Sequence, residues 1–290
     1  MIVVIGASGT IGKALLESLN DKGAKVRAVS RQPELLRQEL GSYVSSDAES
    51  HIMMGDASDR ESLRRAFAGA DQLFLVLSNS PRQVEWETSI IEEAALSGIK
   101  HIVKISSPVF QASAPVAVAG WHGEIEKALE RSGMDYTILR PYAFMQNLFH
   151  HVPAIKARNA FFGTMGEAAC NFVDGRDIAD VAAEVLTNRE VQGGIYTLTG
   201  AETFSYPQIA DQLSRLLGRN IEYVNLDSLA LYQQLTELAG MPPWIARHVV
   251  EIQAMARMVP EGPTGDVQRL LGREPRTLDA FLREHIGKFD

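Results

Sequence analysis

Apolar and polar residues follow one another in short blocks from the start of the chain. The apolar run Ile2–Ile5 leads into a glycine-rich turn, and a helical pattern with one apolar face follows over Ile11–Leu19. The turn contains Gly6, Gly9 and Gly12. Strand, glycine turn and helix in this order form the geometry that holds a dinucleotide pyrophosphate at a helix N-terminus. The pattern predicts a dinucleotide site; the alternative is an ordinary strand–helix turn that is rich in glycine.

The three glycines of this turn have separate predicted roles. Gly6 permits the tight turn, Gly9 lets the backbone approach the phosphates, and Gly12 lets the helix pack closely on the strand. We expect the cofactor to be bound here by Gly6, Ser8, Gly9, Thr10, Ile11 and Gly12.

Strand and helix patterns alternate through the first half of the chain. The predicted strands are Ile2–Ile5, Ala24–Val29, His51–Met54, Gln72–Leu77, His101–Ile105 and Tyr136–Leu139. The predicted helices after the first are Glu34–Leu40, Asp59–Phe67, Gln83–Leu96 and Gly123–Ser132. This alternation is typical of an α/β fold of the Rossmann type, with right-handed crossovers and a doubly wound parallel sheet.

The rhythm changes after about residue 141, where helices dominate. The predicted helices are Phe144–Arg158, Ile178–Leu186, Tyr206–Leu217 and segments within Ser228–Ala239, Trp244–Met258 and Thr277–His285; the predicted strands are Ile195–Leu198 and Ile221–Val224. We expect residues 1–150 to form the nucleotide-binding domain and residues 151–290 a smaller, mostly helical substrate region over the carboxyl ends of the sheet. The two are expected to interleave, with strands near 171–173 and 195–198 as candidates to return to the main sheet.

Composition narrows the class of protein. The 290 residues are 46% hydrophobic, enough for a substantial core, and the net charge of −8 argues against nucleic acid or an anionic membrane as partner. The single cysteine, Cys170, excludes an internal disulfide framework, and the seven histidines show no metal-binding spacing. No apolar run is long enough to span a bilayer, and the first residues lack the basic segment of a signal peptide. We therefore expect a cytoplasmic protein without a metal.

The end of the second strand indicates which dinucleotide binds. NAD-binding folds usually place an acidic residue there, whereas this chain has Ser30 and Arg31. Arg31 can bind a 2′-phosphate and Ser30 can donate a hydrogen bond, which favours NADP (NADPH) over NAD; the alternative is a solvated surface arginine.

Two further pairs of residues are expected to contact the adenosine half of the cofactor. Asp56, followed by Ala57, is a candidate for binding the adenine amino group, although it could instead cap the following helix. Leu77 and Ser78 are expected beside the ribose and pyrophosphate.

Four segments together resemble the atypical short-chain dehydrogenase/reductases, and within them the NmrA-like group. The first is Gly6–Gly12 with Arg31, and the second is His101–Pro108. The third is Trp121–Leu129 followed by Ser132–Pro141, and the fourth is Asp174–Ala179 followed by Tyr196–Gly200. The resemblance implies one of three roles: NADPH-dependent reduction of quinones or dyes, binding of NADP without turnover by a regulator, or a sugar-nucleotide-epimerase-like function. It also implies that the loop at Pro141 and Tyr142 lies by the nicotinamide ring.

The chain departs from its relatives at the proton donor. The superfamily usually has a tyrosine four residues before a lysine and a serine at the end of the fifth strand. Here Gly123 stands four residues before Lys127, and no tyrosine occurs between Tyr43 and Tyr136. Ser106 and Ser107 stand where the serine does, and His122 lies in the segment that would carry the tyrosine. These three residues are the catalytic candidates. The alternatives are a helix-face histidine and two serines that cap a loop.

Without the tyrosine, the chain is better suited to an acceptor whose reduction needs little help from a proton donor. A conjugated acceptor such as a quinone or dye gives a stabilised reduced form, which water or His122 could protonate. The sequence therefore favours an NADPH-dependent oxidoreductase, then a redox-sensing regulator, then an epimerase-like protein.

Aromatic residues in and near the second half are candidates for an apolar acceptor pocket. They are Phe110, Trp121, Phe144 and Phe149. For Phe144 the alternative is a helix stripe that packs in the core together with Met145 and Leu148. A homodimer is compatible with the sequence.

Overall fold

The structure is a computed structural model that describes residues 1–40, 51–108, 116–259 and 261–290. Its centre is a seven-stranded sheet of order β10-β6-β5-β4-β1-β2-β3, in which every neighbouring pair is parallel. The strands are β1 (Ile2–Ile5), β2 (Val26–Ser30), β3 (His51–Met54), β4 (Gln72–Leu75), β5 (His101–Ile105), β6 (Asp135–Pro141) and β10 (Ile195–Leu198). The doubly wound parallel α/β fold predicted from the alternation is confirmed.

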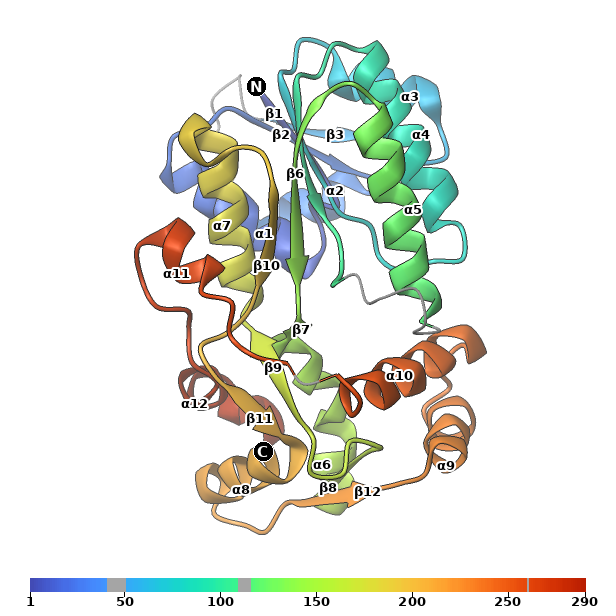
Figure 1. Cartoon of the computed structure of the whole chain (residues 1–290), viewed down its shortest axis with the longest axis vertical. Helices are drawn as coiled ribbons and strands as arrows, with labels where there is room; N and C mark the ends of the chain where they lie inside the picture. The colour runs from blue at the N-terminus through green and yellow to red at the C-terminus, as the bar shows by residue number, and fades with distance from the viewer. Residues whose placement is uncertain (41–50, 109–115, 260) are drawn as a thin grey trace.

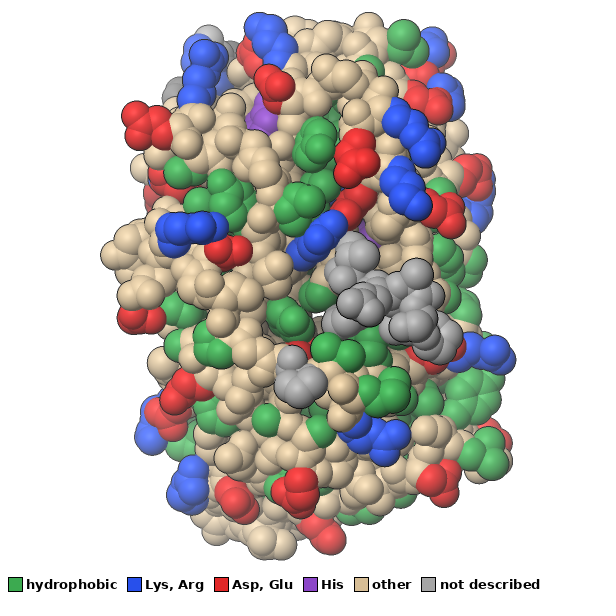
Figure 2. All heavy atoms as spheres, in the orientation of Figure 1, with side chains coloured by type: hydrophobic (Ala, Val, Ile, Leu, Met, Phe, Trp, Pro, Cys, Tyr) green, Lys and Arg blue, Asp and Glu red, His purple; other side chains and the backbone are tan. Residues whose placement is uncertain are grey.

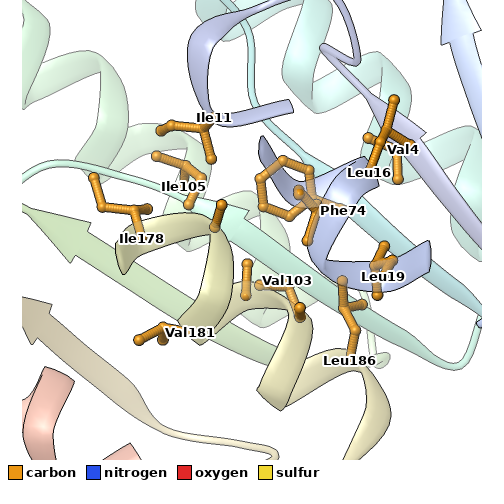
Figure 3. Packing of buried hydrophobic residues seen from close by; sticks show 14 of the residues in the cluster. Val4, Ile11, Leu16, Leu19, Phe74, Val103, Ile105, Ile178, Val181 and Leu186 are labelled. Carbon is orange, nitrogen blue, oxygen red and sulfur yellow. The ribbon is translucent and has the colours of Figure 1, made fainter. Parts of the chain in front are cut away.

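Helices cover both faces of this sheet (Figure 1). One face carries α1 (Thr10–Asp21), α2 (Pro33–Leu40), α7 (Gly175–Thr187) and α11 (Asp266–Leu271), and the other carries α3 (Arg60–Phe67), α4 (Gln83–Leu96) and α5 (Ala117–Arg131). Side chains of the buried strands alternate between the two faces: Val4 and Phe74 pack under α1 and α7, whereas Val3 and Leu73 pack under α3–α5. Figure 3 shows the first of these two layers.

The remaining segments form a smaller region at the carboxyl ends of the strands (Figure 1). Its strands are β7 (Ala143–Phe144), β8 (Ala160–Gly163), β9 (Ala169–Val173), β11 (Thr203–Ser205) and β12 (Glu222–Asn225). Its helices are α6 (Val152–Arg158), α8 (Tyr206–Leu217), α9 (Ser228–Gln233), α10 (Pro243–Ala256) and α12 (Leu278–Phe289). A third apolar cluster, built around Phe161, Phe172 and Phe281, holds this region together.

Two expectations about the second half need correction: the place of residues 171–173 and the helix over Phe144–Arg158. Residues 195–198 form β10 and pair with β6 in the main sheet, but residues 171–173 belong to β9, which pairs with β11 and β7 in a separate three-stranded sheet. The single helix expected over Phe144–Arg158 is wrong, because Phe144 ends β7 and a 3-10 helix, Met145–His151, precedes α6. In the part of the chain that the structure describes, no helix is long and apolar enough to cross a membrane.

Candidate functional site

The glycine loop connects β1 to α1 at the carboxyl edge of the sheet. Gly6 has a backbone φ of +83°, and a Cβ placed on it would lie 2.1 Å from the carbonyl oxygen of Val76. A Cβ on Gly12 would lie 2.2 Å from the carbonyl oxygen of Gly6. Contacts this short require the backbone to move. Both ends of the loop therefore need glycine for steric reasons.

The middle of the loop is open and leaves helix donors free. Ser8, Gly9 and Thr10 are exposed, and Gly9 precedes α1 as its N-cap without any side chain that caps the helix. Ile11 is only 4% exposed and packs in the core, so its backbone N–H is the group it can offer to a ligand. A helix of 12 residues with uncapped N–H groups and a positive dipole end fits a diphosphate at this position.

A second helix begins beside the loop. A Cβ on Gly175, the first residue of α7, would lie 3.3 Å from Cγ2 of Thr10. The Gln146 side chain accepts a hydrogen bond from the Gly175 N–H at 3.0 Å and donates one to Asp174 at 2.9 Å. The sequence did not indicate Gln146 for the site, yet this side chain fixes the start of α7 next to the glycine loop.

The residues predicted to select the cofactor gather at the ends of β2 and β3. Ser30 is buried and its hydroxyl accepts a hydrogen bond from the Gln32 N–H at 3.0 Å, while Arg31 is exposed. Hydrogen bonds from Ser58, and more weakly the charge of Arg31, lower the pKa of Asp56. The cap of α3 is Asp59 rather than Asp56. Arg31 and Asp56 therefore lie close enough to interact. Among the described residues the Arg31 guanidinium forms no ion pair or hydrogen bond that would keep it from binding an anion.

Ala57, Leu77 and Ser78 continue the same edge of the sheet. Ala57 and Leu77 are half-buried and pack against the core on the α3–α5 face, and Ser78 is exposed. Their placement after β3 and β4 agrees with the predicted adenosine edge. Contact with a cofactor stays a prediction.

His122 lies in a buried polar cluster between β5, α4 and α5. It is 6% exposed, and its Nδ1 lies 3.5 Å from Nζ of Lys104. The Lys104 side chain is fully buried; its ammonium pairs with Glu87 at 2.7 Å and also donates to the carbonyl of Ile105. Because an ammonium group can only donate, the Nδ1 of His122 accepts, and the proton of the neutral ring is on Nε2.

This environment argues against the predicted role of His122 as an acid. Burial, followed by the positive charge of Lys104, lowers the pKa of His122 well below its usual value. The ring is therefore neutral near neutral pH. The chemical role left to His122 is that of a neutral hydrogen-bond donor through Nε2.

The two serines after β5 differ in their surroundings. The buried Ser106 hydroxyl donates to Glu126, and Glu126 also accepts from Nε of Arg140 at 3.0 Å, so Ser106 belongs to a structural network. The hydroxyl of Ser107 is buried and has no hydrogen-bond partner among the residues the structure describes. An unpaired buried hydroxyl at the carboxyl end of a strand is free to bind a ligand. Of the two candidates, Ser107 is the one available to a ligand.

The loop after β6 is held by its neighbour strand. Pro141 lies opposite Leu198 in the β6–β10 register, and the Tyr142 N–H donates to the carbonyl of Leu198 at 3.0 Å. Burial, and then the nearby Glu261, raises the pKa of Tyr142. Glu261 was not among the predicted residues. Its carboxylate accepts from the Asn171 N–H at 2.7 Å, a partner 90 residues away along the chain that no local pattern could reveal.

A cavity of about 310 Å³ lies between the start of α5 and α10. Its lining residues are Ala117, Val118, Trp121, Pro243, Trp244, Arg247, His248 and Glu251. Trp121 is one of the predicted pocket residues, and its contact with an acceptor stays a prediction. The rings of Trp121 and Trp244 are 6.1 Å apart. Figure 2 shows hydrophobic side chains across the middle of the molecular face, with charges of both signs around them. An apolar, aromatic wall with a few polar groups is suited to a flat organic ligand.

The other predicted pocket residues lie elsewhere. Phe149 packs against Phe281, with ring centroids 5.4 Å apart, and so belongs to the core of the smaller region instead of lining this cavity. Phe144 on β7 packs against the sheet cluster under α1 and α7. Phe110 lies outside the residues that the structure describes.

Comparison with known proteins shows that the chain is similar to several named reductases. It is 31% identical over 292 residues to the NAD(P)H azoreductase of Xenophilus azovorans, covering 100% of this chain and 99% of that protein. The NADPH-dependent quinone oxidoreductase of Escherichia coli, in complex with NADPH, superimposes with a TM-score of 0.86 at 24% identity and 99% coverage of both chains. Citrobacter sp. triphenylmethane reductase, in complex with NADP(H), gives 0.84 at 22% identity, covering 98% of this chain and 99% of that one.

At these identities the structural likenesses show the fold alone, and the sequence match identifies the family. The family profile described as NmrA-like covers residues 1–282, nearly the whole chain. The protein belongs to the NmrA-like family.

Proposed function

We propose that the protein is an NADPH-dependent oxidoreductase that passes a hydride to a conjugated small-molecule acceptor such as an azo compound or a quinone. The observation that carries the proposal is the glycine loop, where Gly6 and Gly12 leave no room for a Cβ, followed by Arg31 where NAD-binding folds have a carboxylate. The names of the azoreductase and quinone oxidoreductase relatives support the same reaction class.

The residues present fit this cofactor along one edge of the sheet. The loop from Gly6 to Gly12 would hold the pyrophosphate, Ser30 and Arg31 the 2′-phosphate, and Asp56 the adenine amino group. Tyr142 and the unpaired hydroxyl of Ser107 stand at the other end, where the nicotinamide would lie. When bound, the cofactor supplies the hydride; the protein supplies proximity and orientation.

The lack of a strong proton donor on α5 indicates which class of acceptor is reduced. Gly123 occupies the position of the usual tyrosine, and a Cβ on it would meet no atom within 4 Å, so this part of α5 presents open space in place of a phenol. The neutral His122 is a poor proton source near neutral pH. A simple ketone needs an acid for its alkoxide, whereas a conjugated acceptor needs one less. The aromatic cavity at Trp121 and Trp244 suits a planar molecule.

Steady-state oxidation of NADPH with a panel of azo dyes and quinones tests the proposal. We expect turnover with at least one acceptor. Tight binding of both NADP and NADPH without turnover of any acceptor would instead support a redox-sensing regulator.

The cofactor choice is tested with Arg31→Ala. Loss of charge-assisted hydrogen bonds, each worth about 1.5–3 kcal/mol, should weaken NADPH binding roughly 10- to 150-fold and leave NADH binding nearly unchanged. Arg65→Ala is the matched control, because Arg65 is an exposed arginine that pairs with Glu61 on α3. Equal weakening of both nucleotides by Arg31→Ala would remove the argument for NADPH.

A further inference from the structure

Glu261 lies between α10 and α11, and its carboxylate is fixed beside β9. It accepts the Asn171 N–H at 2.7 Å. The β7–β9 pairing starts with Ala143 opposite Phe172, so one register position earlier Asn171 stands opposite Tyr142. The carboxyl group thus takes the position next to Tyr142, where the β7–β9 ladder has not yet begun. The C-terminal part of the chain therefore delivers an acidic group to the carboxyl end of β6.

The surroundings of this carboxyl group are almost without charge. The titratable groups that face it are Tyr142 from the loop after β6, Cys170 from β9 and Tyr206 from α8. Each of these is neutral near neutral pH, since burial raises its pKa. Among the described residues no lysine or arginine forms an ion pair with Glu261. Without a nearby positive charge, nothing stabilises the ionised form of the Glu261 carboxyl group.

The pKa of Glu261 suits proton transfer near neutral pH. Burial raises its pKa to about 7, against the opposing effect of the Asn171 hydrogen bond. A carboxyl group that titrates near the working pH can both give up and regain a proton. His122, by contrast, is neutral over that range.

We propose that Glu261 is the proton donor of the reduction, acting from the C-terminal segment at the carboxyl end of β6 in place of the tyrosine missing at position 123. The inference rests on the proposed function. For an azo acceptor the N=N π bond breaks: one nitrogen forms a bond to the hydride that NADPH loses in its two-electron oxidation, and the other takes the proton of the Glu261 carboxyl group. The product is a hydrazine, and solvent reprotonates the carboxylate.

Two classes of acceptor separate this role from a structural one. A neutral azo dye needs a hydride and a proton, whereas a cationic triarylmethane dye is neutralised by the hydride alone. Single-turnover rates with saturating NADPH are measured for both dyes. Glu261→Gln keeps an oxygen to accept the Asn171 N–H but removes the proton. We expect it to slow azo reduction by roughly 100-fold or more, and to leave the cationic dye within about twofold of wild type.

The control variant is Glu202→Gln, which alters an exposed carboxylate on the loop that the Asn171 side chain binds. It should leave both rates unchanged. The wild-type pH profile adds a readout that needs no variant: azo reduction should fall above about pH 7, where Glu261 loses its proton, and reduction of the cationic dye should not.

The outcomes separate the inference from the function on which it rests. If Glu261→Gln slows both dyes equally, or slows neither, or if the wild-type azo profile is flat, Glu261 is not the donor although the oxidoreductase stands. If the wild-type protein reduces neither dye nor any quinone, the proposed function fails, and the proton donor with it.

Discussion

Replacement of Lys104 by methionine should destabilise the protein strongly. Lys104 on β5 and Glu87 on α4 are both fully buried, and their ion pair is 2.7 Å long. The ammonium forms an ion pair with Glu87 and donates hydrogen bonds to the Ile105 carbonyl and to His122. Lys104→Met keeps the length of the side chain but leaves the carboxylate of Glu87 buried without its counter-charge.

The expected cost is set by this uncompensated charge. Removing one partner of a buried ion pair typically costs about 3–5 kcal/mol of stability. Replacing both partners by apolar groups costs much less, because no charge is then left buried alone. At roughly 2–3 °C per kcal/mol for a chain of this size, the melting temperature should fall by about 6–15 °C. The double variant Lys104→Met/Glu87→Gln removes the charge and retains an oxygen for the Gln83 amide, which donates to Glu87 at 2.9 Å. It should recover at least about 2 kcal/mol of the loss.

Reversible urea unfolding of the wild type, both variants and Lys100→Met measures these differences. Lys100 pairs with Asp71 at the surface, so its replacement should change stability by less than about 1 kcal/mol. A Lys104→Met protein within about 1 kcal/mol of wild type would refute the reasoning. So would a double variant that is less stable than the single one.

Three other perturbations have definite expected results. Gly12→Ala forces a Cβ to within 2.2 Å of the Gly6 carbonyl; stability should fall by about 1–3 kcal/mol and NADPH titration should show weaker binding, whereas unchanged binding would contradict the steric argument. Burial lowers the pKa of His151 from 6.5 to about 4. Between pH 6.5 and about 4 this histidine is therefore protonated in the unfolded chain but neutral in the folded one. As the pH falls through that window, the free energy of unfolding should decrease by up to about 3 kcal/mol. Unfolding of wild type and His151→Phe at several pH values checks this, and parallel curves would count against it. Asp177→Asn removes the negative charge of a fully buried carboxylate that binds two arginines. It should cost about 1–3 kcal/mol in urea unfolding, whereas the exposed control Asp279→Asn should cost much less.

Local patterns were enough to predict the parallel sheet, because its strands are continuous apolar runs and each glycine turn marks a crossover. They were weakest on helices that bury polar residues. Helix α5 begins at Ala117, six residues before the predicted Gly123. The pattern missed this start because the helix buries His122 and Glu126, and because its N-cap, Val116, has no capping side chain. The apolar period is therefore interrupted where the helix faces β5.

The same limit applies to the site. The glycine loop is local in sequence, and its steric basis agrees with the prediction. The partners that decide protonation are not local. His122 is neutral because it is buried and because Lys104, 18 residues away, adds a positive charge. Glu261 binds the backbone of Asn171, 90 residues away. A single sequence shows that these side chains are titratable, but their neighbours, and so their charge, are set by tertiary packing.

The insertion of β10 beside β6 bears on how the chain folds during its synthesis. The strand contributed by residues 195–198 completes one edge of the sheet, and α7 covers α1 through contacts that include Ser18 with Asp180 and Lys22 with Glu184. Until these residues leave the ribosome, β6 is an open edge and the apolar face of α1 is only partly covered. The glycine loop is synthesised first, but the elements that cover β6 and α1, namely β10 and α7, are synthesised much later. Until then the partly folded N-terminal half exposes an unpaired strand edge and apolar surface, through which it could associate with other chains.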